Sequence, residues 1–284
     1  MKRLKKLFVS FMAVVMMCVC AFSLTGCIED LRKLELNVQI YNYDEQVSEE
    51  YTMSIDLYRH LAPKTVDAIV TYVNDGYYTD TVFYKQDSYN SQIMIGDLVY
   101  KNGALDANAI KPQINGEFEK GGTIGSNLTS KKGSIGLWRS WFAQDNSYSN
   151  NANGTDSGRA TWFIPTDTIS AYTGNFCVFG QFDTTAENNS ETLTALNKAF
   201  ENANNYEEYV IYYTGEYNDQ TPDAEDGFGL TMHIVQKDEF DEDGIDGLFK
   251  AEDAQLVCYN HKTVKVPVTS SGAVGAKIVS AKIA

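Results

Sequence analysis

Only two stretches of this chain repeat apolar residues at the spacing of an amphipathic helix. The first starts at Pro63, where proline suits the first turn, and Gly76 stops it. The second carries Leu193, Leu196 and Phe200 on one side. We expect helices over residues 63–74 and 191–202. Because so little of the chain is helical in pattern, its core must come from strands, and the sequence predicts a mainly β antiparallel barrel or sandwich.

The predicted strands are short runs of alternating apolar and polar residues between turn-forming segments. They cover residues 35–41, 51–57, 81–85, 92–96, 134–138, 161–164, 177–182, 230–236, 264–268 and 278–283. An acidic, tyrosine-rich insertion at about residues 203–254 precedes the last two of these strands. We expect the insertion to project beside the main domain as an added subdomain.

The first 26 residues have the pattern of an export signal. Four basic residues at positions 2–6 precede an apolar run over residues 7–24, and Leu24-Thr25-Gly26 then leads into Cys27. This ending resembles the lipobox of bacterial lipoproteins, in which the cysteine is diacylated and becomes the new N-terminus. An ordinary secretory signal and a short membrane anchor are the alternatives. We expect a signal peptide at 1–26, a tether at 27–36 and a folded domain at 37–284.

Charge and cysteine content limit what the chain after the signal peptide is expected to bind and whether its cysteines are expected to pair. The full chain has a formal charge of −15, and removing four basic residues and no acidic ones with the signal gives −19. Such a charge disfavours nucleic acid and anionic membrane surfaces, so membrane contact is expected through lipid on Cys27. Cys177 and Cys258 would be free to pair after export, but their apolar neighbours favour buried thiols.

A series of short motifs runs along the chain in a characteristic order. They are APKTV at 62–66, GYY at 76–78, VFYK at 82–85, IGD at 95–97, GSIGLWR at 133–139, TWFI at 161–164 and VFGQF at 178–182. Their order resembles that of the cyclophilin-type peptidyl-prolyl cis-trans isomerases. The resemblance covers about residues 37–200 and the final strand. It implies a closed eight-stranded antiparallel barrel with two capping helices, and it implies no cofactor.

The same resemblance suggests where the site lies. The family binds a proline ring in an apolar slot, places an Arg near the prolyl nitrogen, and holds the peptide with a Gln, a Trp and a His. In this chain the corresponding positions hold Lys85 for the Arg, Met94 for the Gln, Phe163 for the floor of the slot, Ala171 with Tyr172 beside it for the Trp, and Phe176 for the His. Lys85 is thus the expected catalytic residue, and Phe163, Met94, Tyr172 and Phe176 are the expected substrate-binding residues.

No other pattern of residues predicts chemistry. The acidic run from Glu239 to Asp246 hints at a calcium loop, but Lys250 stands where an EF-hand needs a bidentate Glu. His60, His233 and His261 have no metal-ligand spacing, so no metal site is expected.

Three functions remain open on this evidence. The first is a peptidyl-prolyl isomerase outside the cytoplasmic membrane that acts on proline-containing segments of exported proteins, with activity lowered because its polar catalytic residues are replaced. The second is a non-catalytic peptide-binding or chaperone module on the same fold. The third is a carbohydrate-binding surface lipoprotein, which the many aromatic residues would suit and which would need aromatic platforms away from the slot.

Overall fold

The structure is a computed structural model that describes residues 31–86, 91–119, 126–139, 158–216, 231–240 and 256–284. Within these ranges no helix is both long and apolar enough to span a membrane. The signal segment, Cys27 and most of the calcium-like loop with Lys250 lie outside the described residues.

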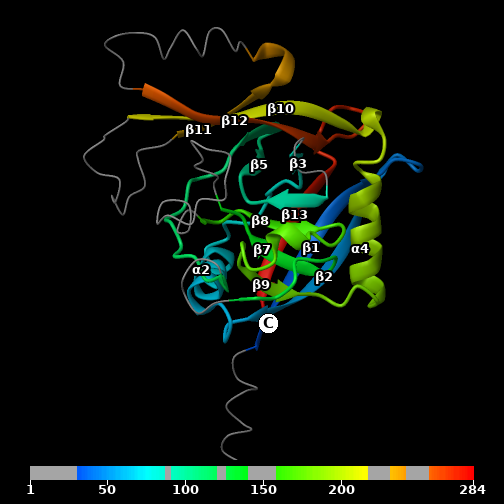
Figure 1. The fold of residues 1–284 in the computed structure, drawn as a ribbon. Helices are drawn as coiled ribbons and strands as arrows, with labels where there is room; N and C mark the ends of the chain where they lie inside the picture. The colour runs from blue at the N-terminus through cyan, green and yellow to red at the C-terminus, as the bar shows by residue number, and fades with distance from the viewer. Residues whose placement is uncertain (1–30, 87–90, 120–125, 140–157, 217–230, 241–255) are drawn as a thin grey trace, which may run out of the picture.

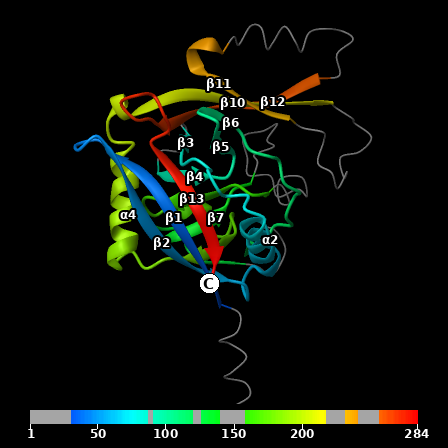
Figure 2. The ribbon, with the colours of Figure 1, turned by 180° about the vertical axis from the view of Figure 1, so that it is seen from behind.

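The main body is a curled antiparallel sheet of seven strands (Figures 1 and 2). In spatial order these are β13 (Ala276–Ile283), β1 (Leu31–Asn42), β2 (Val47–Tyr58), β9 (Val178–Gln181), β7 (Ser134–Leu137), β8 (Trp162–Pro165) and β4 (Gln92–Ile95). The long hairpin of β1 and β2 pairs without a break, from Leu31 opposite Tyr58 to Asn42 opposite Val47. Strand β1 begins inside the segment expected to be a tether.

The sheet is open, so the prediction of a closed eight-stranded barrel is not confirmed. Residues 81–84 run between the two edge strands but pair with each through isolated bridges, Val82 with Lys277 of β13 and Tyr84 with Met94 of β4. The backbone N–H of Phe83 donates to Ala276, whereas the N–H of Tyr84 donates to Met94. Because this short segment divides its hydrogen bonds between two edges, it forms a continuous ladder with neither.

Two amphipathic helices pack on the sheet, as their apolar spacing predicts. Helix α2 (Pro63–Asn74) begins at its proline, and the Glu117 carboxylate accepts hydrogen bonds from the N–H groups of Lys64 and Thr65, at 3.0 and 2.8 Å. Helix α4 (Glu187–Lys198) lies four residues earlier than expected at its start. The buried Asn189 fixes it by accepting from the N–H of Ser54 at 2.8 Å.

The inside of the curled sheet is filled by one continuous apolar cluster. Its largest side chains include Trp162, Tyr78, Phe83 and Phe179, all fully buried. The thiol of Cys177 lies in this cluster as a buried free cysteine, 3.6 Å from the Thr65 hydroxyl. Burial raises the pKa of that thiol to about 12, so it stays protonated and unreactive.

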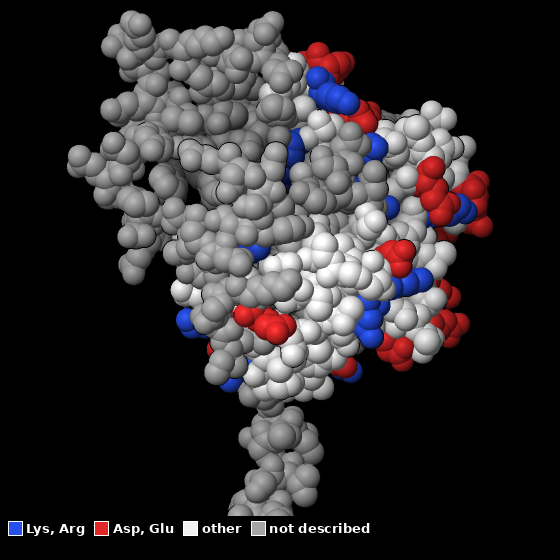
Figure 3. All heavy atoms as spheres, viewed as in Figure 1, with Lys and Arg blue, Asp and Glu red and all other residues white. Residues whose placement is uncertain are grey.

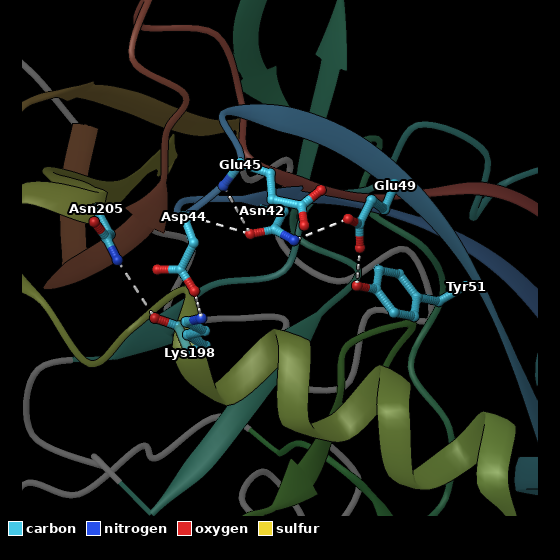
Figure 4. A network of polar contacts seen from close by, with 7 residues as sticks. All are labelled: Asn42, Asp44, Glu45, Glu49, Tyr51, Lys198 and Asn205. Atoms are coloured by element: carbon cyan, nitrogen blue, oxygen red, sulfur yellow. Dashed lines mark hydrogen bonds and ion pairs between the residues drawn. The ribbon is translucent and has the colours of Figure 1, made fainter.

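A polar network ties the β1–β2 turn to the end of α4 (Figure 4). Lys198 forms an ion pair with Asp44, and the Asn205 amide donates to the Lys198 carbonyl at 3.4 Å. The Tyr43 hydroxyl in turn donates to the Asn205 carbonyl at 2.9 Å. On this side of the molecule acidic and basic side chains are mixed (Figure 3). The network fixes the point at which the chain leaves α4.

Beyond that point the chain forms three strands, which join the earlier β3 (Lys85–Gln86) in a second sheet. Its order is β11 (Thr231–Gln236), β10 (Tyr206–Glu216), β12 (Leu256–Pro267) and β3. It lies across one end of the main sheet (Figure 1). The predicted strand at 264–268 is the end of β12 and belongs here, not to the main sheet. A small hairpin, β5 (Leu98–Lys101) and β6 (Ala104–Ala107), turns at Asn102 and Gly103, both with positive φ.

Candidate functional site

Strands β4 and β8 present opposite faces to two different clusters. Ile93, Ile95 and Trp162 point to the inside of the curled sheet, whereas Met94 and Phe163 point to the other side. Met94 lies directly opposite Phe163 in the β4–β8 register, and both side chains are fully buried. Cross-strand partners on one face are within contact distance, so these two residues form a continuous apolar floor.

Three aromatic rings pack on Phe163. Its ring centroid lies 5.5 Å from that of Tyr172 and 5.6 Å from that of Phe176, both edge-to-face. Trp138 stacks on Phe176 at 5.4 Å. Tyr172 belongs to a 3-10 turn, and the N–H of Phe176 donates to its carbonyl at 3.0 Å, which brings the two rings together. We call Met94, Trp138, Phe163, Tyr172 and Phe176 the aromatic face.

A glycine makes room for the central ring. A Cβ at Gly136 of β7 would lie 2.4 Å from Cζ of Phe163, far inside contact distance. The second glycine of the GSIG segment (residues 133–136) therefore allows the tip of the Phe163 ring to approach β7 closely. The four residues expected to bind substrate are thus brought together, since Met94, Phe163, Tyr172 and Phe176 share this one cluster.

Lys85 is not brought to the aromatic face. Its Nζ lies 5.0 Å from the centroid of Phe200, which follows α4. Its neighbour Tyr84 is the residue that points towards Met94, because alternate residues of an extended strand face opposite ways. Burial lowers the pKa of the Lys85 ammonium. The proposed catalytic role of Lys85 stays a prediction, and this geometry does not favour it.

A buried polar network lies beside the aromatic face. The Tyr84 hydroxyl donates to Oδ2 of Asp97 at 2.5 Å, and Nζ of Lys262 donates to the same oxygen at 2.9 Å. The Thr161 hydroxyl donates to the other carboxylate oxygen. Burial by itself would raise the pKa of Asp97, but the charge of Lys262 and the three hydrogen bonds outweigh it, so the pKa lies below its ordinary value.

Sequence reasoning placed Asp97 in a motif but missed its partners. Lys262 is 165 residues away and belongs to β12, so no local pattern connects the two residues. The resemblance predicts a role for the adjacent Lys85 and none for Tyr84.

Two further polar side chains near the aromatic face were also missed. The Arg139 guanidinium carbon lies 5.3 Å from the ring centroid of Phe176 and 4.9 Å from that of Phe118. Gln92 shares a side of β4 with Met94 and is fully buried. Neither atom of the Gln92 amide has a hydrogen-bond partner among the described residues. Arg139 ends the GSIGLWR motif, and Gln92 stands two residues before the position assigned to the family's Gln.

Comparisons with known proteins identify the family of the chain. A sequence model of the family "Cyclophilin type peptidyl-prolyl cis-trans isomerase/CLD" matches residues 44–215, more than half of the chain. No curated protein matches.

Two solved structures of a Cryptosporidium parvum cyclophilin type peptidyl-prolyl cis-trans isomerase are also similar. The one determined with the dipeptide Ala-Pro is 20% identical, covering 55% of this chain and 84% of its own, with a TM-score of 0.33. The other is 18% identical, covering 56% and 83%, with a TM-score of 0.34. The chain belongs to the family of cyclophilin-type peptidyl-prolyl cis-trans isomerases.

Proposed function

We propose that this protein is a weak peptidyl-prolyl isomerase that acts on exported proteins and is held to a bacterial membrane by lipid on Cys27. The observation that carries the proposal is the aromatic face, in which Met94 and Phe163 form a floor and Tyr172 and Phe176 pack beside it. Such a surface suits a proline ring. The export and anchoring rest on the signal pattern that ends at Cys27.

The reaction requires binding energy directed at a twisted amide. Rotation about an X–Pro bond is opposed by amide resonance, with a barrier of about 18–20 kcal/mol. A catalyst lowers it by binding the twisted amide better than either planar isomer. An apolar surface contributes because the twisted amide is less polar than the planar one and suffers less from loss of water.

The polar groups available explain why we expect low activity. Tyr84 already donates its hydroxyl to Asp97, and Lys85 lies over Phe200. Gln92 has an amide suited to a peptide backbone, and Arg139 supplies a positive charge next to Phe176. Loss of one preorganised donor typically costs about 10²–10³ in rate in sites that stabilise a developing charge.

The test is a protease-coupled isomerase assay with a proline tetrapeptide on the chain starting after Cys27. We expect slow but measurable turnover, which Phe163→Ala abolishes. Phe182→Ala, which removes a buried ring from the inside of the curled sheet, controls for general loss of stability and keeps turnover. Equal loss in both variants, or full activity in Phe163→Ala, would place the site elsewhere.

The position of Lys85 over Phe200, away from the aromatic face, favours a second candidate, a peptide-binding module without catalysis. All four predicted binding residues are at most 3% exposed. Under this alternative a proline peptide binds, as measured by calorimetry, and Phe163→Ala removes the binding, but neither protein turns the peptide over.

The carbohydrate-binding alternative has one candidate platform. Tyr212 and His233 stack with centroids 4.9 Å apart on the side of the second sheet away from the aromatic face, and Phe240 lies 5.9 Å from Tyr212. All three are half-buried. Glycan binding that is lost in Tyr212→Ala and kept in Phe163→Ala would support it.

A further inference from the structure

The second sheet packs its inner side against the cluster that contains the aromatic face. Ile211 of β10, Met232 of β11, and Val264 and Val266 of β12 are at most 8% exposed and belong to the same apolar cluster as Met94 and Phe163. Figure 1 shows β10, β11 and β12 lying across the main sheet as a separate layer. The surface proposed to take a proline ring therefore lies in one buried cluster with side chains of the second sheet.

A charged contact reinforces this packing. Lys262 of β12 points inwards and reaches Asp97, and the two side chains are only 13% and 11% exposed. Its Nζ also lies 5.6 Å from the ring centroid of Tyr84, which pairs with Met94. The second sheet is thus held by apolar contacts and by one largely desolvated ion pair.

The connections of the second sheet to the rest of the chain gather at one end. The chain enters β10 at Tyr206 and leaves β12 at Pro267, and these two residues are paired. Next to them the N–H of Val268 donates to the Asn205 carbonyl at 2.9 Å. The backbone pairing of β12 with β3, at Val264 and Lys265, lies close to the same end. Ile211, Met232 and Lys262 lie farther along the strands, as in a flap attached along one edge.

We propose that β10, β11 and β12 form an intramolecular cover over the aromatic face, and that a proline peptide reaches Met94 and Phe163 only when this cover swings away about residues 205–206 and 267–268. The inference rests on the proposed function. The cover makes the apparent activity proportional to the fraction of molecules in which it is open. It also gives the extra sheet a role, because its inner side chains compete with the substrate for the same surface.

The test weakens the cover without touching the aromatic face. Ile211→Asp places a charge on the inner side of β10, and Met232→Ala is a milder variant on β11. Thr263→Asp is the matched control, because it places the same charge on the outer side of β12, next to Lys262. Each is made in the chain starting after Cys27. Turnover of a proline tetrapeptide and hydrogen exchange by mass spectrometry are measured on every variant.

We expect Ile211→Asp to speed hydrogen exchange in residues 206–216 and 256–267 and to leave β1 and β2 protected. It should also raise kcat/KM by roughly tenfold or more, because the burial of one isoleucine side chain stabilises the closed form by a corresponding free energy. Met232→Ala should act in the same direction with a smaller effect, and Thr263→Asp should change kcat/KM less than twofold.

Two results would overturn the cover, and they can be told apart. If hydrogen exchange shows a loosened second sheet while kcat/KM is unchanged or lower, the cover is rejected and the isomerase function stands. If neither the unmodified protein nor the loosened variants bind or turn over a proline peptide, the proposed function itself is rejected, and the cover falls with it.

Discussion

Lys262 and Asp97 are 165 residues apart in the sequence, and Nζ of the first donates to Oδ2 of the second at 2.9 Å. Asp97 stands two residues after the end of β4, the strand that carries Met94, whereas Lys262 belongs to β12 of the second sheet. This ion pair therefore joins the layer that bears the aromatic face to the layer that covers it. The strength of this ion pair affects both the stability of the fold and the access of a peptide to the aromatic face.

Acidification should weaken the junction between these layers. The pKa of Asp97 lies below its ordinary value of about 3.9, so the ionised carboxylate stabilises the fold. This contribution is fully present above about pH 4, the value for the unfolded chain, and is lost as the pH falls through the lower folded value. Urea unfolding between pH 2 and pH 6 should show a steeper loss of stability in the unmodified protein than in Asp97→Asn. Identical pH profiles would contradict it.

Removing Lys262 should cost more than removing a surface lysine. Lys262→Met leaves the Asp97 carboxylate largely desolvated without its cation, and we expect the free energy of unfolding to fall by about 3 kcal/mol. The matched control is Lys282→Met, which breaks the exposed pair with Glu35 and should cost less than about 1 kcal/mol. Chemical unfolding of both variants measures the difference. Equal losses would mean that the Lys262 pair is energetically an ordinary surface contact.

The predicted lipid anchor is attached through one side chain, that of Cys27. Because Leu24-Thr25-Gly26 precedes Cys27, the sulfur of Cys27 is the expected site of lipid attachment. Cys27→Ala should abolish incorporation of labelled fatty acid in a bacterial host, whereas Cys177→Ala, which removes a buried thiol, should leave it intact. Labelling that persists in Cys27→Ala would reject the lipoprotein assignment.

Local sequence patterns predicted the parts of the fold that are set locally. The helix beginning at Pro63, the hairpin of β1 and β2 and the strand carrying Phe163 all follow from residue spacing and turn residues. In each of these elements the spacing of the apolar residues fits only one arrangement, because a single apolar face must point into the core.

Two features of the structure depend on which strands pair and in which register, and the spacing of apolar residues does not reveal either. The alternation at Val264 and Val266 fits a strand of either sheet, and only its pairing with β10 and β3 places it in the second one. The resemblance predicts that residue 85 faces the site, but a shift of one position along a strand moves a side chain to the opposite face. In the structure Tyr84, not Lys85, faces Met94. The contact between Lys262 and Asp97 carries no local signal at all.

A substitution at Gln92 is expected to change stability and peptide binding in opposite directions. Its amide is fully buried on the same side of β4 as Met94, and no described residue hydrogen-bonds to it. A buried amide without a partner costs about 1–3 kcal/mol, so a side chain kept only for packing would be better replaced by an apolar one. We therefore expect Gln92→Met to raise the free energy of unfolding by about 1 kcal/mol.

The same substitution should lower the affinity for a proline peptide, because the amide can pair with the peptide backbone once the peptide occupies the aromatic face. Ile93→Leu, a volume-conserving change at the neighbouring residue, which faces the other side of β4, should alter both quantities little. Urea unfolding and peptide calorimetry on the two variants provide the measurements. If Gln92→Met is destabilised, its amide has a structural partner in the folded chain; if it is stabilised and binds the peptide as before, Gln92 takes no part in binding.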